Sequence, residues 1–184
     1  MARNDRTTHD AACTECRHLR LEADDARAFE VAPADIGGWR MWSKALLRMV
    51  RRMGDQPTQA IVISQEPFTQ RYLQAVVGHG IARVEASSNA SLQGMHRLTD
   101  DHHQLLVLLG WRPPTDESLD PRDGPGSWSL PLVHRTWDDM VDVISATTIG
   151  VFGFSEHLPV SVITFGSVHP CRSCSWPETA REFR

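Results

Sequence analysis

The sequence lacks long apolar runs and the short motifs that mark the common enzyme classes, and it has almost no lysine. No stretch approaches the roughly 20 apolar residues that a bilayer span needs. Lys44 is the only lysine. The chain has no dinucleotide-binding fingerprint, no phosphate-binding P-loop and no G-x-S-x-G nucleophile turn, and no catalytic triad can be nominated. These absences predict a protein that spans no membrane and is not an enzyme.

Charge and length set further bounds. The formal net charge of −4 gives the whole chain no attraction to nucleic acid or to an anionic membrane. Residues 1–6 are polar and carry no apolar segment of the kind that a signal peptide needs, so we expect a cytoplasmic protein. A length of 184 residues with 41% hydrophobic content is sufficient for one compact domain with a core.

The centre of the chain, residues 59–114, begins with a pattern that is typical of strands. Residues 61–63 form a short apolar run, and residues 70–77 alternate between apolar and polar side chains. Glycines at 78 and 80 favour a tight turn, because glycine adopts positive φ without strain. The alternation resumes over residues 81–86, which predicts an antiparallel hairpin with one solvated side.

A short helix is predicted to follow. Thr99 provides a hydroxyl N-cap in front of two aspartates, and Gly110 stands where a left-handed C-terminal cap belongs. A helix of this length is not stable alone in water, so we expect its leucines to lie on the sheet. These leucines are Leu105, Leu106, Leu108 and Leu109.

Three further segments complete the C-terminal half. Residues 113–131 are rich in proline, glycine and aspartate and predict a loop. Thr136 and Asp139 stand at capping-box positions and predict a helix that glycine at 150 or 153 ends. Residues 160–165 form a strand-like apolar run.

The N-terminal third is predicted to be helical. Residues 11–29 are rich in alanine and charge and indicate one helix. Residues 39–53 form the most amphipathic segment of the chain, with an apolar face and a basic face that includes no acid. This helix has three interpretations: its apolar face packs on the sheet, it binds a protein partner, or its arginines contact nucleic acid or a membrane surface.

Several of these features together resemble one family. The hairpin ends in Ser87-Ser88-Asn89, the acidic-start helix ends in Leu109-Gly110-Trp111, and Trp128 and a final apolar segment follow. Over about residues 59–165 this pattern is similar to the TY-Chap superfamily, which joins the type III secretion chaperones to the YbjN-like proteins. The resemblance implies an α+β fold with an antiparallel sheet flanked by helices.

The expected domain organisation follows from this resemblance. Residues 1–56 form a helical N-terminal arm that contains the basic amphipathic helix. Residues 57–166 form the TY-Chap-like α+β domain, and residues 167–184 form a short C-terminal tail. We found no internal repeat.

The resemblance also implies a function. It implies binding of a protein or peptide partner without covalent chemistry, and members of the family are often dimers. An exposed strand edge would accept an added strand, and large aromatic and basic side chains would contact the partner. The candidate partner-binding residues are Trp39, Trp42, Arg48, Arg51, Arg52, Tyr72, Trp111 and Trp128. For each tryptophan the alternative is core packing. The alternative function is a zinc-containing nucleic-acid-binding or regulatory protein that uses the basic helix.

The four cysteines form two C-x-x-C pairs, Cys13 with Cys16 and Cys171 with Cys174. Four thiolates with this spacing are typical of a closed, structural zinc site, which would join the helical arm to the C-terminal tail and perform no chemistry. Incidental free thiols and a thiol–disulfide redox pair are the alternatives. The zinc site requires the two ends of the chain to meet.

Overall fold

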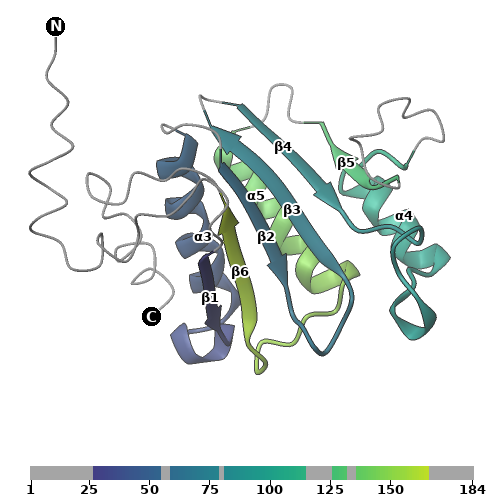
Figure 1. Cartoon of the computed structure of the whole chain (residues 1–184), viewed down its shortest axis with the longest axis horizontal. Coiled ribbons are helices and arrows are strands. Elements are labelled where there is room, and N and C mark those ends of the chain that lie inside the picture. Colours follow the sequence, from purple (N-terminus) through teal and green to yellow (C-terminus); the bar gives the residue numbers. More distant parts are fainter. Residues whose placement is uncertain (1–26, 55–58, 79–80, 115–125, 132–135, 166–184) are drawn as a thin grey trace, which may run out of the picture.

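The computed structural model describes residues 27–54, 59–78, 81–114, 126–131 and 136–165, and its centre is one antiparallel sheet (Figure 1). The strands are β1 Arg27–Val31, β2 Gln59–Ser64, β3 Tyr72–Gly78, β4 Ile81–Ala86, β5 Trp128–Leu130 and β6 Val160–Phe165. They lie in the order β1-β6-β2-β3-β4-β5, and every neighbouring pair is antiparallel. The predicted α+β class and the predicted hairpin of β3 and β4 are confirmed.

Helices cover one face of this sheet. The α-helices are α3 Trp39–Gly54, α4 Asp100–Leu108 and α5 Trp137–Ala146. Short helical turns precede α3 at Pro33–Ile36 (η1) and α4 at Gly94–His96 (η2), and α5 continues into a π-helical turn at Thr147–Val151 (η3). In Figure 1, α3 and α5 lie behind the sheet, whereas α4 lies beyond β5 at its side.

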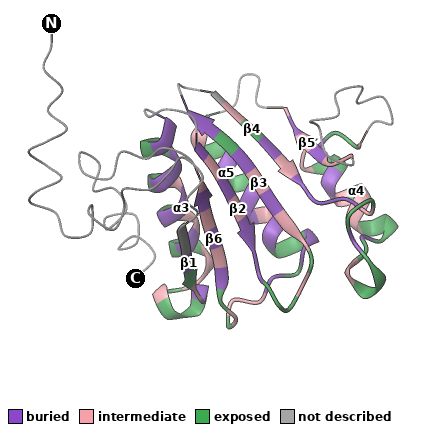
Figure 2. Ribbon diagram, in the orientation of Figure 1, coloured by how far each residue is buried: buried purple, intermediate pink, exposed green. Residues whose placement is uncertain are grey.

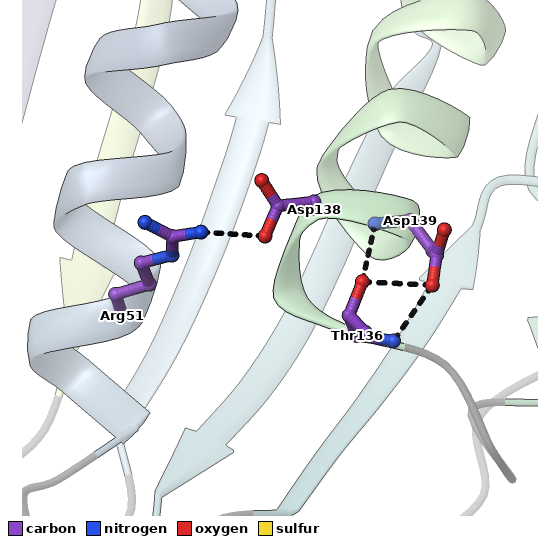
Figure 3. Close-up of polar contacts among 4 residues, drawn as sticks. All are labelled: Arg51, Thr136, Asp138 and Asp139. Atoms are coloured by element: carbon purple, nitrogen blue, oxygen red, sulfur yellow. Dashed lines mark hydrogen bonds and ion pairs between the residues drawn. The ribbon is translucent and has the colours of Figure 1, made fainter.

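The amphipathic helix α3 supplies much of the core. Its apolar residues recur every three or four positions, and Trp42, Leu46 and Val50 are fully buried. The core-packing interpretation of this helix therefore holds for its apolar face. On its exposed side Arg51 forms a salt bridge of 2.6 Å with Asp138 of α5 (Figure 3). Such an exposed pair contributes at most about 1 kcal/mol.

Both predicted helix caps are present. Thr136 Oγ1 accepts the Asp139 N–H at 3.2 Å, and Asp139 Oδ2 accepts the Thr136 N–H at 2.8 Å, which forms a capping box (Figure 3). Thr99 caps α4 in the same way, with His102 in the third helical position. These side chains satisfy amide groups that the first helical turn leaves without partners.

The C-terminal end of α4 is built as predicted, but its leucines are not all on the sheet. Gly110 has φ of 89°, and the amides of Gly110 and Trp111 bond back to the carbonyls of Val107 and Leu106. Leu106 is fully buried, whereas Leu108 is 82% exposed. The expectation that all four leucines lie on the sheet is wrong, because α4 packs against η3 at the side of the sheet and buries only one face.

Two further expectations need correction. Arg27–Val31 is a strand paired with β6, so the helix expected over residues 11–29 does not reach its predicted end; residues 11–26 lie outside the described residues. Trp128–Leu130 is a strand within the expected loop over residues 113–131. Both strands are short edge strands that are fixed by pairing with β6 and β4, and local sequence patterns do not carry that information. Within the described ranges, no helix is both long and apolar enough to cross a membrane.

Candidate peptide-binding face

The face of the sheet turned away from α3 and α5 is crossed by no described helix (Figure 1). Along the strands, buried residues alternate with partly exposed residues, which Figure 2 shows in purple and pink. Because successive side chains of a strand point to opposite faces, the buried set faces the helices and the partly exposed set lies on the other face. We call this second face the open face. Its side chains at the centre of the sheet are Ala60, Val62, Gln74, Val76, Arg83, Glu85, Ile163 and Phe165.

One half of the open face is apolar. Strand register places Ala60 opposite both Phe165 on β6 and Val76 on β3. The next row places Val62 opposite Ile163. Directly opposed side chains in an antiparallel pair are neighbours, so these five residues form one continuous apolar block over β6, β2 and β3. Val76 is 43% exposed, which is unusual for a valine in a central strand.

The other half of the open face is polar and internally paired. Gln74 Nε2 donates to Glu85 Oε2 at 2.5 Å, and Arg83 Nη2 lies 2.7 Å from Glu85 Oε1. Glu85 thus receives contacts from both neighbours and is held in place. The open face therefore offers apolar contact next to a fixed carboxylate and guanidinium, an arrangement that suits non-covalent binding of a polypeptide.

The two edges of the sheet differ. On the β5 side, Arg112 exchanges backbone hydrogen bonds with Ser129 at 2.8 and 3.0 Å, so a further segment already covers part of this edge. On the opposite side, β1 is the outermost described strand and pairs with β6 over five residues. A sheet edge can accept a strand from another chain, and β1 is the described strand that lies at such an edge.

The structure does not bring the sequence-predicted aromatic residues together on one surface. Trp42, Trp111 and Trp128 are buried in the core, as the core-packing alternative expects. Trp39 is half-buried and meets Trp42 edge-on at 5.5 Å between ring centroids. Tyr72 is half-buried and is the first residue of β3, on the same face as Gln74 and Val76. Of these five candidates, Tyr72 lies on the open face.

The three candidate arginines lie elsewhere. Arg48, Arg51 and Arg52 are exposed on α3, on the side that does not pack into the core. Because α3 lies behind the sheet, this basic surface and the open face are on opposite sides of the molecule. The nucleic-acid interpretation of the basic helix stays a prediction.

Sequence patterns did not reveal a partly buried arginine that joins three loops. Arg71 donates to four backbone carbonyls: Nε to His96 at 2.9 Å, Nη2 to Arg97 at 3.1 Å, and Nη1 to Val151 and Phe152 at 3.2 and 3.1 Å. Partial burial lowers the pKa of Arg71. The guanidinium therefore joins η2 and the residue after it to the end of η3.

Burial and the nearby Arg71 guanidinium affect the protonation of His102, in the first turn of α4. The pKa of His102 lies below its ordinary value of 6.5, first because burial disfavours the charged ring and second because Arg71 repels it; Asp101 opposes and His103 adds to the shift. The His102 Nδ1 atom also accepts the Thr99 N–H at 3.1 Å. The unfolded chain thus binds this proton at a higher pH than the folded chain does.

We therefore expect the stabilising effect of neutral His102 to be complete above about pH 6.5 and to be lost as the pH falls below it. The measurement is the melting temperature between pH 8 and pH 5. His102→Gln keeps a cap acceptor and removes the titrating ring, so the acid-side decrease should shrink. An unchanged decrease in His102→Gln would assign the pH dependence to other groups and contradict this prediction.

The predicted zinc ligands Cys13, Cys16, Cys171 and Cys174 all lie outside the described residues. Among the residues that the structure does describe, no group of three or more histidine, cysteine, aspartate or glutamate side chains could hold a metal ion. The zinc site stays a prediction.

The chain was compared with models of known protein families. Residues 33–158 match the model of a family described as TY-Chap3, T3SS (YopN, CesT) and YbjN peptide-binding chaperone 3. The match begins before the expected start at Gln59 and includes η1 and α3, and it ends before β6. Searches of curated proteins and of solved structures gave no match.

Proposed function

Because the chain belongs to the TY-Chap3 family of peptide-binding chaperones, we propose that it binds an extended segment of a partner protein on the open face, without covalent chemistry. The single observation that carries the location is the continuous apolar block of Ala60, Val62, Val76, Ile163 and Phe165 on a face that no described helix crosses. Exposed apolar side chains that form a contiguous patch mark interaction sites in soluble domains.

An extended peptide suits this face better than a globular surface does. Every second side chain of an extended chain points the same way, so a peptide that crosses β6, β2 and β3 would place alternate apolar side chains on the block. The Glu85–Arg83 pair at the polar margin would then meet polar groups of the peptide and set its direction. We expect peptides with alternating apolar residues to bind best.

The test is binding of peptides that are first identified by pull-down and peptide mapping and then titrated by fluorescence anisotropy. Val62→Thr with Val76→Thr keeps both β-branched shapes and adds hydroxyl groups to the block. We expect about tenfold weaker binding, which corresponds to about 1.4 kcal/mol. Val76→Asp places a charge in the block and should abolish binding at the concentrations used.

Leu108→Asp is the matched control, because it replaces an exposed apolar residue on α4, away from the open face. Its peptide affinity should equal that of the wild type. If Leu108→Asp loses binding while both open-face variants retain it, the proposed location is wrong. If no peptide is recovered above background, the proposed function itself fails.

A further inference from the structure

The charged side chains of the open face lie at its two margins. None of the open-face positions of the three central strands β6, β2 and β3 holds an acidic or basic residue. The charged residues that strand register assigns to this face are on β1, on β4 and on the segment that pairs with β5. The apolar block is therefore bordered by charge on both sides.

The margin at β4 and β5 carries a net positive charge. Ser129 on β5 is the register partner of Glu85, and Arg112 is in turn the bridge partner of Ser129. Directly opposed residues point to the same side of a sheet, so Arg112 extends this row of the open face. Arg83 and Glu85 balance each other in their salt bridge. Arg112 is exposed, and within the described part of the chain its side chain forms no ion pair, so one positive charge remains.

The margin at β1 carries a negative charge. Glu30 is the register partner of Ser161 on β6, and the residue before it, Phe29, is buried opposite the buried Val162. Because successive side chains of a strand alternate, Glu30 lies on the open face. Glu30 is exposed and has no ion pair with any residue that the structure describes. The open face is therefore polarised, with an acidic margin at β1 and a basic margin beyond β5.

The distance between the two margins fits a short extended peptide. The order β1-β6-β2-β3-β4-β5 has five steps between strands, and the segment of Arg112 adds a sixth. Neighbouring strands lie about 4.8 Å apart, so the two margins are separated by about 29 Å. Extended chain covers about 3.3 Å per residue, so about nine residues span this distance.

We propose that the open face selects extended segments of about nine residues with an acidic end, an alternating apolar centre and a basic end. The acidic end lies over Arg112 and the basic end over Glu30. This inference rests on the proposed function and deepens it by naming the chemistry of the partner segment. Exposed ion pairs contribute little free energy each, so the apolar block supplies most of the affinity and the two margins set the orientation.

The test uses two designed peptides that differ only in charge order. Each has nine residues, with valine alternating with threonine in the centre and blocked ends that carry no charge. One begins with aspartate and ends with lysine, and the other has these two residues exchanged. A nitroxide amino acid precedes the first residue of each, and line broadening of the backbone amide signals of the full-length chain locates it. We expect the aspartate-first peptide to broaden the amides of β5 and the lysine-first peptide to broaden those of β1.

A charge-exchange variant makes the test specific to the two margins. Glu30→Lys with Arg112→Glu keeps the net charge of the chain and reverses the polarity of the open face, so each nitroxide should move to the opposite margin. The matched control is Lys44→Glu with Asp142→Lys, an equal exchange between exposed residues of α3 and α5 behind the sheet. This control should bind both peptides in the wild-type orientation.

Affinity gives a second readout. Arg112→Glu alone should weaken binding of the aspartate-first peptide about three- to fivefold at low salt, as expected for an exposed ion pair. A peptide with serine at both ends should bind the variant and the wild type equally. The difference for the aspartate-first peptide should disappear at about 1 M salt, where the screening length falls to about 3 Å.

The comparison of the two peptides on the wild-type chain does not depend on any variant folding. Broadening of the same margin by both peptides, or of both margins equally by each, overturns the proposal and leaves the proposed function standing. The same conclusion follows if neither designed peptide binds while a peptide recovered by pull-down does. If no peptide of any kind binds, the proposed function fails and this proposal fails with it.

Discussion

Replacing Trp111 by alanine should lower the free energy of unfolding by about 3–5 kcal/mol. The side chain is 3% exposed, and its backbone N–H closes the C-terminal end of α4 on the Leu106 carbonyl. Its indole Nε1–H donates to Oγ1 of the buried Thr147 at 2.9 Å, at the start of the π-helical turn η3. The substitution therefore leaves a cavity and removes the bond that joins the end of α4 to η3. Urea unfolding at pH 8 measures the change.

Milder variants separate the two contributions. Trp111→Phe and Thr147→Val each leave one buried polar group without its partner, and each should cost about 1–3 kcal/mol. The double variant removes both partners, so its cost should fall below the sum by about 0.5–1.5 kcal/mol. Additive costs in this cycle would show that the hydrogen bond contributes nothing. A loss below about 1 kcal/mol for Trp111→Ala would contradict the packing argument.

Much of the sheet could be predicted from the sequence, because local periodicity carries the information. The apolar runs of β2 and β6, the alternation in β3 and β4, and the threonine caps of α4 and α5 depend on residues close together in the chain. The strands β1 and β5 could not be predicted, because pairing with distant strands creates them. The prediction for the leucines of α4 was wrong for a related reason, since composition alone does not show which side of a helix packs against the rest of the protein.

The candidate site was less accessible to sequence reasoning than the fold. Large tryptophans indicated contact surfaces, but three of the five aromatic candidates lie in the core, where their size contributes most to stability. The apolar block of the open face consists of one alanine, two valines, an isoleucine and a phenylalanine, and only the arrangement of the helices shows that these residues face away from the core. The alternation was visible in the sequence, but the identity of the covered face was not.

Gly54→Ala should lower the free energy of unfolding by about 1–3 kcal/mol, although helix propensity alone favours alanine by about 1 kcal/mol. A Cβ atom at this position would lie 2.7 Å from Cζ2 and 3.1 Å from Cε2 of Trp137, where α3 meets α5. The indole ring is rigid and half-buried, so one of the two helices has to move. The overlap therefore outweighs the gain in propensity, and thermal or urea unfolding measures the result.

Two further variants make this prediction specific to the contact between Gly54 and Trp137. Trp137→Leu removes the ring atoms that an alanine at position 54 would meet, so in that background Gly54→Ala should cost little or even stabilise the fold. Gly150→Ala is the matched control, since its Cβ would lie 3.5 Å from Leu105 Cδ2, an ordinary contact. We expect Gly150→Ala to change stability by less than about 1 kcal/mol. Equal costs for the two glycine substitutions would show that close packing of α3 on α5 does not require glycine at position 54.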